Sequence, residues 1–115
     1  MKCSESFLKF VEPLWEGIPE LTEKNIAPVF IAGYTVWNAV VLNNLGITSM
    51  FLKSLKGSDD LEFLKTVDML IERKMRFFKD DNWFIGKYEF SILDNENINL
   101  QVSLVDPYTL SFGDK

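Results

Sequence analysis

Histidine is absent from this 115-residue sequence, and cysteine occurs only once. Without histidine the chain has no Ser-His or Cys-His nucleophile, no histidine ligand for zinc and no histidine proton shuttle. Because Cys3 has no second cysteine to pair with, an intramolecular disulfide is excluded. The N-terminal residues also lack the apolar run of a secretory signal. Together these absences predict a cytoplasmic protein.

Recognisable phosphate and metal motifs are also missing. The six glycines are isolated, so the sequence contains neither a P-loop nor the dinucleotide fingerprint. Read as calcium loops, the acidic turns place an apolar residue at the fifth position and no glycine at the sixth. The carboxylate pairs Asp59-Asp60 and Asp80-Asp81 are adjacent on polar turns, which rarely separate two pKa values as acid and base catalysis requires. We therefore predict no catalytic residues, no metal, no cofactor and no enzymatic activity.

The chain is acidic overall, with a formal net charge of −5. This charge repels nucleic acid and anionic membranes at long range. The length and the hydrophobic fraction of 47% are those of one globular domain with its own core. We therefore predict a single domain over residues 1–115.

No charged residue occurs between Asn25 and Leu52, and residues 26–42 are almost continuously apolar. An apolar segment of about 17 residues is at the lower limit for crossing the hydrocarbon core of a membrane. It also carries Pro28 and Asn38, and no basic cluster flanks it. We interpret it as a buried or dimer-forming helix and predict no membrane contact. Because so small a domain has limited interior, we expect a second copy to cover part of this helix.

Apolar residues with helical spacing predict three to four helices over about residues 4–79. The first covers residues 4–16, where the apolar side chains form one stripe. Pro13 lies inside that stripe, so we expect this helix to kink there or to end near Val11.

Residues typical of helix termini predict where the remaining helices begin and end. The apolar central helix is expected to begin at residues 25–28, with its proline in the first turn, and to end near residues 43–46. A shorter helix is expected over residues 47–55. The last helix is expected to begin at Ser58 as its N-cap, because acidic residues follow at once and basic residues crowd its far end.

After the last helix the apolar period changes from that of a helix to that of a strand. Residues 87–92 and 98–104 alternate between apolar and polar side chains, and a polar turn separates them. A third alternating segment follows Pro107, so the β part covers about residues 84–112. The predicted fold class is α+β: three to four N-terminal helices packed on a C-terminal antiparallel β-hairpin or three-stranded meander.

Aromatic residues gather where the last helix meets the first strand. Such a cluster anchors a partner, lines a ligand pocket or fills the core, and the sequence leaves these interpretations open. The possible partner or ligand surface comprises Phe77, Phe78, Trp83, Phe84, Trp37 and Tyr88.

Four cations crowd the end of the last helix: Arg73, Lys74, Arg76 and Lys79. Helices followed by a hairpin are also typical of winged-helix DNA-binding domains, in which such cations would contact phosphate. The acidic total charge argues against that role, and interaction with the helix dipole explains the same cluster.

These observations predict a non-enzymatic protein-interaction domain that binds a protein partner or itself, as a homo-oligomer. One alternative is a winged-helix-like nucleic-acid-binding regulator. The other is a small ligand-binding protein or a carboxylate-based enzyme.

Overall fold

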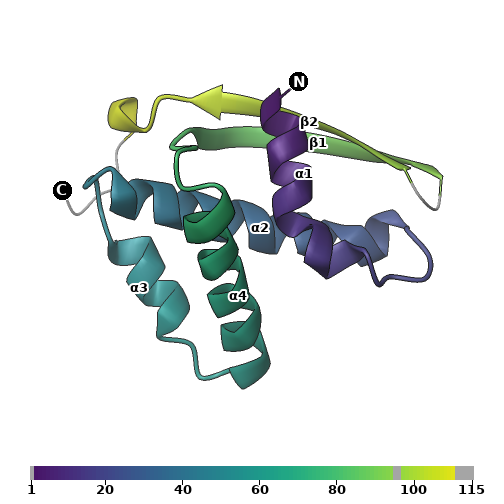
Figure 1. Ribbon diagram of the computed structural model, residues 1–115, viewed down its shortest axis with the longest axis horizontal. Helices are drawn as coiled ribbons and strands as arrows, with labels where there is room; N and C mark the ends of the chain where they lie inside the picture. Colours follow the sequence, from purple (N-terminus) through teal and green to yellow (C-terminus); the bar gives the residue numbers. More distant parts are fainter. Residues whose placement is uncertain (1, 95–96, 111–115) are drawn as a thin grey trace.

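The computed structural model describes residues 2–94 and 97–110, and it shows four helices followed by a two-stranded antiparallel hairpin (Figure 1). The elements are α1 (Lys2–Trp15), α2 (Glu23–Asn44), α3 (Met50–Lys56), α4 (Leu61–Phe77), β1 (Phe84–Asp94), β2 (Asn97–Val105) and a short 3₁₀ turn (Pro107–Thr109). The hairpin lies on one side of α2, and α3 and α4 project from the other (Figure 1). The α+β architecture expected from the sequence is confirmed.

Helix α2 is the centre of the molecule, since it contacts α1, α3, α4 and β1. The Thr22 hydroxyl caps its start and accepts a hydrogen bond from the Asn25 backbone N–H at 3.2 Å. This cap starts the helix at Glu23, so Pro28 lies in the second turn and not in the first as expected. At the other end the chain leaves the helix through Gly46, which has a φ of 74°.

Helix α1 crosses α2 at Gly33, where a Cβ atom would overlap the Val11 side chain. Of the two outcomes expected at Pro13, an end near Val11 does not occur: α1 continues past Pro13 to Trp15. A proline has no N–H, so Pro13 cannot bond the carbonyl of Lys9 four residues before it. The Arg73 guanidinium of α4 donates to that carbonyl instead, at 2.7 Å.

The start of α4 also differs from the sequence prediction. Asp60, not Ser58, is the N-cap: its carboxylate accepts hydrogen bonds from the N–H groups of Glu62 and Phe63 at 3.0 and 3.2 Å. The Ser58 hydroxyl accepts from the Asp60 N–H and shapes the turn before the cap. Both residues are good caps, and a carboxylate gains additionally from the positive end of the helix.

Large rings fill the core between the helices and the inner face of the hairpin. Trp37 is fully buried, with its ring centroid 5.1 Å from that of Phe10, 5.7 Å from Phe78 and 4.3 Å from Trp83. Its indole N–H donates to the Trp83 carbonyl at 2.9 Å, so this large side chain is both packed and hydrogen-bonded.

The hairpin is attached to the helices through side chains that bond its backbone. The buried Asn38 amide donates to the Ile85 carbonyl and accepts from the Ile85 N–H, both at 2.9 Å. The Ser4 hydroxyl of α1 accepts from the Val102 N–H at 3.1 Å. These bonds satisfy polar groups in the core and place one face of the sheet on α1 and α2.

The third strand that the sequence allowed does not form over the residues described. Pro107–Thr109 make a 3₁₀ turn, capped by the Asp106 carboxylate, which accepts from the Tyr108 N–H at 3.0 Å. The rest of that expected strand, residues 111–112, lies outside the described residues.

Candidate functional site

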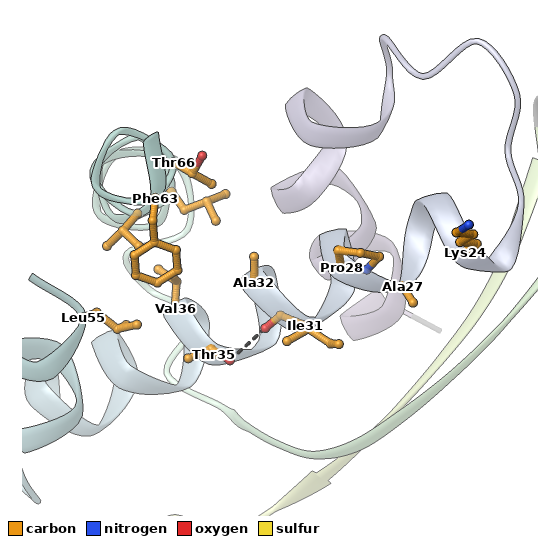
Figure 2. Close-up of a pocket in the computed structure, with 12 residues that line it drawn as sticks. Lys24, Ala27, Pro28, Ile31, Ala32, Thr35, Val36, Leu55, Phe63 and Thr66 are labelled. Atoms are coloured by element: carbon orange, nitrogen blue, oxygen red, sulfur yellow. Dashed lines mark hydrogen bonds between the residues drawn. The ribbon is translucent and has the colours of Figure 1, made fainter. Parts of the chain in front are cut away.

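An open apolar groove of about 520 Å³ lies between the N-terminal half of α2 and the facing sides of α3 and α4 (Figure 2). We call it the α2–α4 groove. Its floor is a stripe of α2 residues at helical spacing, and its wall is a stripe of α4. The floor stripe consists of Lys24, Ala27, Pro28, Ile31 and Thr35. The wall stripe consists of Phe63, Thr66, Val67 and Leu70.

The floor stripe is the one side of α2 that the fold leaves open. Ile26 and Phe30, on other sides of the helix, are fully buried, and the Phe30 ring packs against Phe7 of α1 and Phe90 of β1. Ile31, in contrast, is 57% exposed, and Phe63 on the wall is 38% exposed. Two large apolar side chains from different helices therefore meet water at the same groove.

The groove has few free polar groups, because its two threonines bond their own helices. The Thr35 hydroxyl donates to the Ile31 carbonyl at 2.8 Å, drawn as a dashed line in Figure 2, and the Thr66 hydroxyl donates to the Glu62 carbonyl at 3.2 Å. The Lys24 ammonium is the one charged group among the lining residues, and it stands at one end (Figure 2). Such a surface selects for apolar occupants and offers no set of ligands for a metal.

The aromatic residues singled out from the sequence lie elsewhere. Trp37, Phe78 and Trp83 come together within the core, as the ring distances show, and Phe84 is only 8% exposed. These four residues line no part of the α2–α4 groove.

Tyr88 and Phe77 are separated from that cluster. The Tyr88 ring packs against Phe30 and Tyr34, with centroids 5.9 and 5.4 Å away. Burial raises the pKa of Tyr88, and the neighbouring Tyr34 adds a smaller effect. Phe77 is 62% exposed on the outer side of α4, and the Arg73 and Arg76 guanidinium carbons each lie 5.7 Å from its ring centroid.

Lys74 is not available to phosphate, because its side chain is fully buried. Its ammonium donates to the carbonyls of Phe78 and Asp81 at 2.7 and 2.8 Å and lies 4.3 Å from the centroid of the Trp37 ring. Burial lowers the pKa of Lys74 from 10.5 to about 8, and the Asp81 carboxylate opposes this shift. Lys74 therefore joins the end of α4 to the loop before β1.

Arg73 is half-buried and bonded to α1, since it donates to the Phe10 carbonyl at 3.0 Å as well as to that of Lys9. Of the four cations proposed for phosphate, Arg76 and Lys79 remain on the surface. Arg73 and Lys74 therefore stabilise the fold, whereas Arg76 and Lys79 are exposed to solvent.

Sequence reasoning missed the α2–α4 groove. Lys24, Ala27, Pro28, Ile31 and Thr35 have the spacing of a single helical stripe, which is visible in the sequence. The signal was hidden because α2 is apolar on nearly every side, so that no face stands out as the exposed one.

Helix α2 is long and apolar enough to cross a membrane by length and composition alone, with a mean hydropathy of 1.4, while 61% of that window is buried by the rest of the chain. Among the described residues, no three His, Cys, Asp or Glu side chains gather as metal ligands would. The chain matches no protein-family model, and no curated protein or solved structure is significantly similar to it.

Proposed function

We propose that the protein is a non-enzymatic interaction domain whose α2–α4 groove binds an apolar protein surface. The observation that carries this proposal is the character of the groove. Ile31 and Phe63 stay exposed there, while the hydroxyls of Thr35 and Thr66 are bonded to their own helices. A partner gains by burying apolar area, and few polar groups of the groove lose water when it binds.

The shape of the groove fits a helix of the partner. Lys24 and Val36 mark its extent on α2, and at about 1.5 Å per residue the twelve steps between them span roughly 18 Å. Three turns of an amphipathic helix have this length and present apolar side chains at i, i+3, i+4 and i+7.

The same proposal places the protein in the cytoplasm, with α2 in the interior of the domain and not in a bilayer. Burial of most of α2 by its own chain supports this placement. A membrane would also have to accommodate α3 and α4, which project from the side of α2 away from the hairpin and carry exposed charged residues.

Site-specific photo-crosslinking tests the proposal. A photoreactive amino acid replaces Ile31 in the full chain, which is produced and irradiated in its native cells. The matched control carries it at Leu104, a 47% exposed apolar residue of the hairpin, on the other side of α2.

We expect one discrete crosslinked protein from position 31 and none from position 104. The Phe63→Glu substitution should abolish this product, because it places a charge in the wall of the groove. Absence of any product at position 31, or a product unchanged by Phe63→Glu, would show that the groove is not a binding site.

A further inference from the structure

We propose that the surface bound in the α2–α4 groove is a second copy of the same chain, with the two α2 helices antiparallel across a twofold axis near Ile31. This inference rests on the function proposed above and names its partner. It follows from the shape of the groove and from the position of its charges.

A twofold contact requires one patch that carries both a projection and the hollow that receives it. The floor of the groove has both. Ile31 projects and is 57% exposed, whereas Ala27, one turn before it in the stripe, is small. In an antiparallel pair, Ile31 of each copy fits over the small Ala27 side chain of the other, which is how helices pack closely.

The walls of the groove permit this arrangement. Helix α4 borders the groove near Val36, and the floor towards Lys24 is free of it (Figure 2). A second α2 helix placed antiparallel on this floor brings its own α4 to the opposite end. Each α2 helix then lies between the other α2 and an α4 wall, so the contact is closed and does not propagate.

Charge supports the antiparallel direction. Lys24 lies at one end of the groove, and Phe63 and Leu55 lie at the other (Figure 2). Glu62 is exposed beside Phe63, in the first turn of α4. An antiparallel second copy brings its Lys24 to this end, so that two Lys24–Glu62 pairs form between the copies. A parallel pair would place the two lysines together instead.

The second copy also explains why an acidic chain has a long segment without charge. Each chain carries −5, so two chains repel one another at long range. Contact between the apolar parts of the two floor stripes removes apolar area from water and brings no further like charges together. The Lys24 ammonium of each copy then lies beside the Glu62 carboxylate of the other. The uncharged stretch and its single flanking lysine thus fit a self-complementary surface.

Sedimentation velocity of the purified full chain, from about 1 to 200 µM, tests the inference. We expect wild type to be dimeric in the upper part of this range and Ile31→Glu to be monomeric throughout. Leu104→Glu, which adds the same charge on the hairpin, should dimerise as wild type does. Ile31 is exposed, so Ile31→Glu should fold, which thermal unfolding verifies.

A charge exchange tests the direction of the two helices. Lys24→Glu and Glu62→Lys should each weaken dimerisation by about fivefold to tenfold, because like charges then face one another at both ends. The double variant should return to within about twofold of wild type. A double variant as weak as the singles would overturn the antiparallel arrangement.

A monomeric wild type at 200 µM would overturn the second copy as partner. The crosslinking experiment separates this outcome from failure of the proposed function. A position-31 product of a mass other than twice that of the chain would leave the groove as a binding site for another protein. No product at all would remove both proposals.

Discussion

Helix α1 contains a proline, and we expect its continuation past Pro13 to depend on Arg73 of α4. Pro13 leaves the Lys9 carbonyl of α1 without a helical donor. The Arg73 guanidinium donates to this carbonyl at 2.7 Å and to that of Phe10 at 3.0 Å. If these bonds allow α1 to continue past Pro13, then removing Arg73 should lower the free energy of unfolding most when the proline is present.

The size of the effect follows from these two bonds. A hydrogen bond to a charged group contributes about 1.5–3 kcal/mol when buried, and less when water can replace it. The Lys9 bond is exposed and the Phe10 bond is partly buried. We therefore expect Arg73→Met to lower the free energy of unfolding by about 2–3 kcal/mol.

The Pro13→Ala background should reduce that loss. An alanine at position 13 has an N–H that can bond the Lys9 carbonyl, so only the Phe10 bond still depends on Arg73. We expect Arg73→Met to cost about 1 kcal/mol less in this background, which is the interaction free energy of the pair. Arg73→Lys is a matched control: it keeps the charge but loses the planar fork that reaches both carbonyls, and should cost about half as much as Arg73→Met.

Urea denaturation of wild type, the two single variants and the double variant gives the interaction energy directly. Equal costs of Arg73→Met in both backgrounds, within about 0.3 kcal/mol, would refute the reasoning. Arg73 would then stabilise the fold by packing or charge alone.

Three further predictions concern the core. Because the pKa of Lys74 is lowered from 10.5 to about 8 by folding, the unfolded chain binds more protons between these values, so stability should rise with pH from about 8 to 10.5. Denaturation across this range should show the rise in wild type and not in Lys74→Met, and equal slopes would contradict it. Gly33→Ala should destabilise by about 1–3 kcal/mol despite the better helix propensity of alanine, because the new Cβ overlaps Val11. Adding Val11→Ala should recover part of this loss in thermal unfolding, and strict additivity would count against the overlap. Asn38→Leu should cost about 2–4 kcal/mol, since it leaves the buried Ile85 N–H and carbonyl unpaired. It should also speed hydrogen exchange at the Ile85 amide, and a cost below about 1 kcal/mol would show that water replaces the side chain.

The sequence by itself determined the order and type of the four helices and the two hairpin strands. The period of residues 87–92 and 98–104 predicted the hairpin, and the structure pairs them, for example Tyr88 with Val102. The stripes of the first and last helices were recognised because their charged residues mark the outer face. Local spacing carries this information, since a half-buried helix or strand must repeat its apolar residues with its own period.

Choices between equivalent local signals were decided by tertiary contacts. Ser58 and Asp60 are both competent caps, and in the folded chain Asp60 caps the helix while Ser58 bonds the Asp60 N–H. Pro13 was expected to kink α1 or to end it near Val11, but the helix continues, and Arg73, sixty residues later in sequence, donates to the Lys9 carbonyl that the proline cannot bond. Lys74 has the sequence position of a surface cation, yet packing on Trp37 buries it.

The α2–α4 groove is the clearest case of a feature that only the tertiary structure decided. The absence of charge in α2 from Asn25 onwards predicts that the helix is covered on most sides. It does not predict which side stays open, because a helix that is apolar all round has no preferred orientation of its own. The crossing of α1 at Gly33, the hairpin bonded to Asn38 and the wall of α4 cover three sides, and the stripe around Ile31 is the side that remains.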